Sequence, residues 1–258
     1  MEKQRSGKQR AAASSKRKAP VLCAAVLGLG ALAASLWSAF APFPRLEVAG
    51  FRITEEEYLH TMYQARNDVL SDHAAAGISL TDWSTETALG DPRELTMERA
   101  LDRLCEHYAI AELAVERGYL TDAGYEAMVR DLEEYNRRRQ EALDSGAMVT
   151  GLPQFSMADY ITYRASNLRL QFCSDPENPE FQVSPEEVQQ RYEADRDNLY
   201  RQPDSTDHQY VPLEEVQSIV VQSIRESRYD ALIAGRMEAQ ELTGNLSALS
   251  RFTAEQLP

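Results

Sequence analysis

The sequence has little cysteine and histidine, and neither is arranged as in a metal site or a nucleophilic enzyme. There are 3 cysteines and 4 histidines in 258 residues, and none of them are spaced as zinc ligands. The HExxH motif, the P-loop, the dinucleotide-binding glycine pattern and G-x-S-x-G are all missing. We therefore expect no catalytic residue, no metal and no cofactor of these classes.

Lysine is absent after Lys18, and charge is divided unevenly along the chain. The first 20 residues carry seven cations and one acid, whereas the remainder carries 20 arginines and 40 acidic residues. Nucleic-acid binding depends on neutralising phosphates with cations. The long acidic part is therefore expected not to bind nucleic acid.

An apolar run without charged residues covers residues 21–41. Such a run just reaches the roughly 20 residues that a membrane-spanning helix needs. With the basic residues 1–20 before it, it predicts an uncleaved signal anchor in the cell membrane, with a cytoplasmic N-terminus and an extracytoplasmic C-terminal part. The alternative is a cleaved signal peptide, since Ala39 and Ala41 form an A-x-A pattern, but Pro42 directly after the cut argues against cleavage.

Helical spacing dominates the rest of the sequence. Apolar residues three and four apart predict a central helix over 96–118, with further helices over 54–69, 121–143 and 212–242. Ser156 and Ser184, each with an acid three residues later, predict two more helix starts. No long period-two alternation occurs, so the predicted class is all-α.

These patterns predict the domain boundaries. Residues 42–50 form a stalk, 51–242 a helical domain and 243–258 a flexible tail. Cys105 and Cys173 could form one disulfide outside the cytoplasm, but both lie among apolar helical residues, where unpaired thiols are the commoner state.

Aromatic residues gather in the middle of the domain. Any single one is more simply a core residue, but as a set they predict a cleft that binds apolar peptide segments. The members of this set are Tyr125, Tyr135, Phe155, Met157, Tyr160, Tyr163, Phe172 and Tyr192. The nearby run Arg137 to Arg139 is most simply a charged helix face, although it suits a carboxylate as well.

The order of the segments resembles that of a known family. The segments are the helix start Ile53-Thr54-Glu55-Glu56-Glu57, the helix end Ala114-Val115-Glu116-Arg117-Gly118-Tyr119, the capped start Val183-Ser184-Pro185-Glu186-Glu187-Val188 and the closing start Val211-Pro212-Leu213-Glu214-Glu215-Val216. Together they resemble the chaperone domain of the SurA and PrsA group of extracytoplasmic peptidyl-prolyl isomerases. The resemblance implies a helical peptide-binding domain of the trigger-factor and SurA type, in which a returning C-terminal helix completes a cradle.

The chain departs from this family where the parvulin isomerase domain is expected. In that family the isomerase domain lies between two helices that residues 185–199 and 212–242 resemble. Here only residues 200–211 lie between these two segments, far fewer than the roughly 50 residues of a small domain. The leading hypothesis is thus a membrane-anchored chaperone that holds unfolded secreted polypeptides and lacks isomerase activity. The alternatives are an envelope scaffold or adaptor with one specific partner, and a true isomerase.

Overall fold

The computed structural model describes residues 42–202 and 209–258, and divides the chain into the units Met1–Pro42 and Phe43–Pro258. The following concerns the second unit. Its elements, in chain order, are β1 (Leu46–Val48), β2 (Phe51–Arg52), α2 (Glu55–Ala75), α3 (Pro92–Glu116), α4 (Tyr125–Asp144), α5 (Met157–Ser174), the 3₁₀ turn η1 (Pro179–Phe181), α6 (Pro185–Leu199), α7 (Leu213–Ala239), β3 (Leu242–Gly244) and α8 (Leu246–Gln256).

A three-stranded antiparallel sheet corrects the predicted all-α class. Its strand order is β2-β1-β3, with Val48 paired to Phe51 on one side and to Leu242 on the other. Ala49 and Gly50 make the turn between β1 and β2 with φ angles of 51° and 79°, as a tight two-residue hairpin requires. Strands of two and three residues are too short to show alternation, and β3 comes from the opposite end of the unit.

The sheet forms one core with α2, α3 and α8. Leu46, Tyr58, Leu104, Leu249 and Phe252 are all buried in the same cluster. The Tyr58 hydroxyl also shares a buried hydrogen bond with the hydroxyl of Thr253, 2.5 Å away. The segment 243–258, predicted as a flexible tail, thus contains the end of β3 and a packed helix, and the predicted stalk contains β1.

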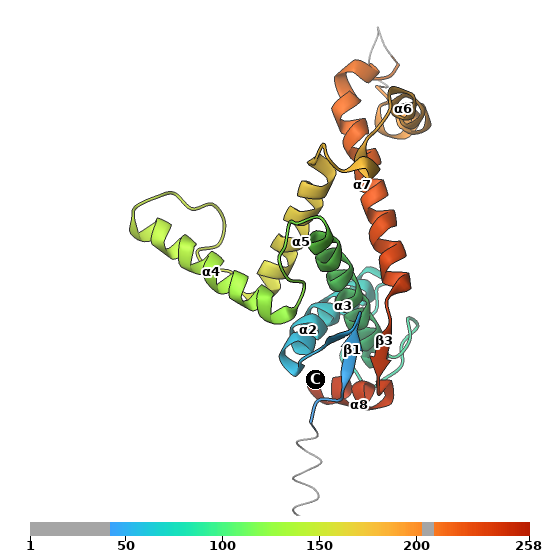
Figure 1. Cartoon of the computed structure of the whole chain (residues 1–258). Helices are drawn as coiled ribbons and strands as arrows, with labels where there is room; N and C mark the ends of the chain where they lie inside the picture. Colours follow the sequence, from blue (N-terminus) through green and yellow to red (C-terminus); the bar gives the residue numbers. More distant parts are fainter. Residues whose placement is uncertain (1–41, 203–208) are drawn as a thin grey trace, which may run out of the picture. The chain divides into compact units, whose positions relative to one another are not determined.

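Helix α7 joins this core to the rest of the unit. Near its start it packs on α6 through Val188, Val216 and Val220, and further along it packs on α3 and α5 through Tyr229 and Ile233 (Figure 1). Helix α4 packs on α5 in a separate cluster. The apolar contacts are therefore divided among several small cores.

Local sequence determines most helix starts. Ser156 and Ser184 each accept from the backbone N–H three residues later, and the acid at that position bonds back, so both predicted capping boxes are confirmed. Thr54 caps α2 as expected. The central helix begins earlier than predicted, with Asp91 as its cap; the Thr96 hydroxyl is buried and donates to the Pro92 carbonyl.

The predicted membrane topology is also corrected. Among the helices of residues 42–202 and 209–258, none has the length and apolar character needed to cross a bilayer. The predicted span, residues 21–41, and the predicted basic tail, residues 1–20, lie outside the described residues.

Candidate functional site

Six of the eight predicted peptide-binding residues share one cluster between α4 and α5. They are Tyr125, Tyr135, Phe155, Met157, Tyr160 and Tyr163. The Tyr135 ring is at the centre, with its centroid 5.2 Å from that of Phe155 and 5.0 Å from that of Tyr163. Tyr125, Met157 and Tyr160 are buried, whereas Tyr163 is exposed. The cluster mainly packs α4 against α5. Among its rings, that of Tyr163 is exposed to solvent.

The other two predicted residues lie elsewhere. Phe172 is fully buried between Tyr119 and Tyr229. Tyr192 stacks on Tyr200, and its hydroxyl donates to the Val211 carbonyl at 2.6 Å. Helical spacing predicts which face of its own helix a residue lies on, but not which residues of other helices it meets. The eight residues therefore do not line one cleft.

The loop between α4 and α5 is held against α4 by polar contacts. The Asn136 side chain accepts from the Phe155 backbone N–H at 2.8 Å and donates to its carbonyl at 2.9 Å. The Arg139 guanidinium donates to the carbonyls of Thr150, at 2.8 Å, and Leu152, and also lies over the Phe155 ring. Of the arginine run, Arg139 alone makes these loop contacts.

Beyond these contacts, three apolar side chains are exposed at the far end of α4. Met148 is 98% exposed, Leu152 is 50% exposed and Leu143 is 37% exposed. We call these three residues the apolar tip. Figure 1 shows the end of α4 and the following loop extending away from the other helices. Exposed apolar side chains on a protruding segment can contribute to a protein-binding surface, and methionine adapts to varied partners.

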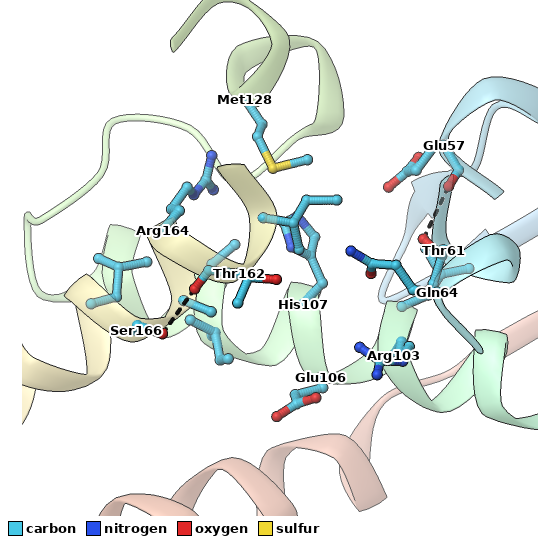
Figure 2. Close-up of a pocket in the computed structure, with 16 residues that line it drawn as sticks. Glu57, Thr61, Gln64, Arg103, Glu106, His107, Met128, Thr162, Arg164 and Ser166 are labelled. Carbon is cyan, nitrogen blue, oxygen red and sulfur yellow. Dashed lines mark hydrogen bonds between the residues drawn. The ribbon is translucent and has the colours of Figure 1, made fainter. Parts of the chain in front are cut away.

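A pocket of about 200 Å³ lies among α2, α3, α4 and α5 (Figure 2). Its wall is largely apolar, with Leu104, Ile110, Met128, Ile161 and Leu168. Met128 and Ile161 also belong to the α4–α5 cluster, so the pocket and the cluster share a wall. Its interior carries three polar side chains that the wall does not satisfy.

The first is Glu57, a carboxyl buried on α2. Its Oε1 accepts from the Tyr108 hydroxyl at 2.7 Å, while its Oε2 has no partner. Burial raises the pKa of Glu57 to about 7, against the lowering effect of the Tyr108 hydrogen bond. This carboxyl is therefore about half protonated at neutral pH.

The second is His107 on α3, whose Nε2 is buried without a partner. Burial lowers the pKa of His107 to about 3, and the positive charge of Arg164 acts in the same direction. The imidazole is therefore neutral across the physiological range.

The third is Arg164 on α5, whose side chain is only 7% exposed. Both Nη1 and Nη2 lack a hydrogen-bond partner, and the nearest carboxylate, Asp131, is exposed and 3.8 Å from Nη1. Desolvation lowers the pKa of the guanidinium, but an arginine keeps its charge in proteins. A buried cation with so little compensation is costly.

Polar side chains at the mouth of the pocket are satisfied, in contrast to those inside. Gln64 donates to the Ala158 carbonyl at 3.2 Å, and Arg103 donates to Asp68 at 2.9 Å. The hydroxyl of Ser166 donates to the Thr162 carbonyl at 2.9 Å. Unpaired polar atoms are thus concentrated inside, where they can bind a ligand. Among the described residues, no group of three or more His, Cys, Asp or Glu side chains is placed to hold a metal ion, and Cys105 and Cys173 are free thiols.

Sequence reasoning missed this pocket. Glu57 stands in the sequence within a helix start, and His107 lies in the central helix, so neither position by itself indicates a pocket. A usable indication was the row Tyr160, Arg164 and Leu168, four residues apart on one helix face. An arginine inside an apolar row is buried, and a buried arginine indicates a binding role or an ion pair.

Comparisons with known proteins identify one informative relative. A curated protein of Bifidobacterium longum subsp. longum, named chaperone for lacto-N-biosidase, is 32% identical to this chain over 160 residues. The match covers 62% of this chain and 55% of the relative, so the chain spans about half of the relative's length. No protein-family model matches the chain. No solved structure matches it.

Proposed function

We propose that this protein is a chaperone that binds an enzyme client during folding, and that its client range is narrow. The observation that carries the proposal is the 32% identity over 160 residues to a protein named as the chaperone for lacto-N-biosidase. That name specifies one enzyme as client, which favours a dedicated chaperone over a general one. A glycosidase of this kind is therefore the first client to test.

The apolar tip supports this proposal as the client-binding surface. Met148 and Leu152 are exposed, yet the loop that carries them is fixed by Asn136 and Arg139. A fixed loop limits the conformational entropy lost when a partner binds. An incompletely folded client exposes apolar segments, and these would cover the tip until folding buries them.

The path of α7 supports a SurA- and PrsA-like arrangement. This helix returns to pack on α3 and α5, and β3 after it pairs with β1, as the resemblance implies for a helical part closed by a returning helix. Residues 200–212 join α6 to α7, at the position where the isomerases of that group carry their catalytic domain. We therefore propose chaperone activity without prolyl isomerisation.

A refolding assay tests the proposal. Lacto-N-biosidase unfolded in guanidinium is diluted into buffer with the full chain or with an equal mass of serum albumin, and recovered activity is measured. We expect higher recovery with the chain, and loss of most of that gain in the Met148→Ser/Leu152→Ser variant.

Leu170→Ser is the matched control, because Leu170 is also an exposed leucine but lies near the opposite end of α5. Its effect on recovery should be small. Equal recovery with the chain and with albumin, for lacto-N-biosidase and for other glycosidases, contradicts the proposal. Stable binding to the native enzyme without any effect on recovery would instead indicate an adaptor.

A further inference from the structure

The pocket among α2, α3, α4 and α5 has the features of a ligand site that the proposed chaperone function does not require. It combines an apolar wall with three polar side chains that have buried atoms without partners: Oε2 of Glu57, Nε2 of His107 and both terminal nitrogens of Arg164. In the view of Figure 2, His107 lies between Arg164 on one side and Glu57 on the other.

We propose that this pocket binds the carboxylate end of an apolar amino-acid residue, with the ligand carboxylate on Arg164. Two N–H groups of one guanidinium match the two oxygens of a carboxylate. Arg164 lacks a hydrogen-bonded partner and is nearly fully buried, so a ligand anion would supply the charge compensation that Asp131 at 3.8 Å does not.

The other unpaired atoms match the group next to such a carboxylate. A terminal residue carries a backbone N–H beside its carboxylate, and the buried Nε2 of His107 or Oε2 of Glu57 can accept that proton in a hydrogen bond. The mouth residues Gln64, Arg103 and Ser166 are already paired. Specific recognition therefore falls to the interior.

The volume and the apolar wall of the pocket determine the size and polarity of the ligand side chain that it can hold. An apolar cavity of about 150 Å³ holds benzene, so about 200 Å³ suits one leucine-sized residue. Leu104, Ile110 and Met128 would contact its side chain. The same chemistry occurs in a free N-acylated amino acid and in the C-terminal residue of a polypeptide.

Calorimetric titration of the full chain with N-acetyl-leucine and N-acetyl-leucinamide tests the inference. We expect N-acetyl-leucine to bind at least tenfold more tightly than N-acetyl-leucinamide. The amide keeps the leucine side chain and the backbone N–H but lacks the carboxylate. Equal binding of both compounds, or no binding of either, overturns the inference.

Two variants assign the binding to the pocket. Arg164→Gln should weaken N-acetyl-leucine binding at least tenfold and abolish the preference over the amide, whereas Arg169→Gln should retain both. Arg169 is a suitable control because it pairs with Asp230 on α7 outside the pocket. Ala165→Leu narrows the pocket without removing a charge and should also abolish binding; retention of binding in both pocket variants overturns the assignment.

A third comparison distinguishes the two sources of the ligand. A short peptide ending in leucine that binds at least tenfold more tightly than N-acetyl-leucine identifies a polypeptide C-terminus as the ligand. Equal or weaker binding of the peptide identifies a free small acid. These outcomes do not depend on the refolding assay, so the pocket and the chaperone proposal can fail separately.

Discussion

The stability of this protein should depend on pH through two buried groups that act in opposite directions. Glu57 and His107 line the same pocket, and burial disfavours the charged form of each. For Glu57 the uncharged form is protonated, whereas for His107 it is deprotonated. Replacing either residue with glutamine should therefore expose the pH dependence of the other.

The sign and size follow from the pKa values. The pKa of Glu57 rises from 4.5 to about 7 on folding, so its contribution to the free energy of unfolding is greatest below pH 4.5 and is lost as pH rises through 7. At 1.36 kcal/mol per pKa unit, this loss is about 3 kcal/mol. The pKa of His107 falls from 6.5 to about 3, so its contribution is present above pH 6.5 and is lost as pH falls to 3, by about 5 kcal/mol.

In the wild type the two slopes oppose each other between pH 4.5 and 6.5. As pH rises from 4.5 to 7, the free energy of unfolding of Glu57→Gln should increase relative to that of the wild type. As pH rises from 3 to 6.5, the free energy of unfolding of His107→Gln should decrease relative to that of the wild type. Each difference should change by about 1.4 kcal/mol per pH unit within its window. In the Glu57→Gln variant, the amide oxygen would still accept from Tyr108, and the amide nitrogen would replace the unpartnered Oε2.

Urea unfolding of the full chain at half-unit steps from pH 3 to 8 measures these differences. Glu106→Gln is the control, because Glu106 is exposed at the mouth of the same pocket, and its profile should run parallel to the wild type. Parallel profiles for Glu57→Gln, His107→Gln and the wild type would refute the reasoning, since neither group would then be held in its neutral form by folding.

Two further predictions concern packing around the loop and the last helix. Arg139→Ala should speed amide hydrogen exchange in residues 148–154 about five- to tenfold, because it removes the contacts to the Thr150 and Leu152 carbonyls. Arg138→Ala removes only the exposed ion pair with Glu134 and should leave exchange in these residues unchanged. Equal effects of the two variants would contradict the role assigned to Arg139. Leu249→Ala should lower the free energy of unfolding by about 2–4 kcal/mol because Leu249 is fully buried. Leu246→Ala, at an exposed position, should lower the free energy of unfolding by less than about 0.5 kcal/mol. Similar urea midpoints for the two variants would show that α8 is not packed on the core.

The starts of α2, α5 and α6 could be predicted from the sequence because their causes are local. Ser156 and Ser184 meet acids three residues later, and each box closes within a single helical turn. The end of α3 at Glu116 and the left-handed Gly118 after it follow from the same short-range chemistry.

Features built from distant segments could not be predicted in this way. The pairing of β1 with β3 depends on three residues at each end of the unit, and the burial of Leu249 and Phe252 depends on that pairing. Tyr135 and Tyr163 could be placed on helix faces, but their contact requires α4 and α5 to pack. The pocket has the same origin, since three helices each contribute one of its unpaired polar groups.

Photo-crosslinking during refolding tests the central claim most directly. A benzophenone amino acid in place of Met148 should crosslink the full chain to lacto-N-biosidase soon after dilution from guanidinium, and the crosslinks should disappear as enzyme activity returns. The same label at Leu170 should give few crosslinks at any time. Crosslinking that is absent from position 148, or that is equally strong at both positions and unaffected by folding of the enzyme, would contradict a chaperone that holds its client at the apolar tip.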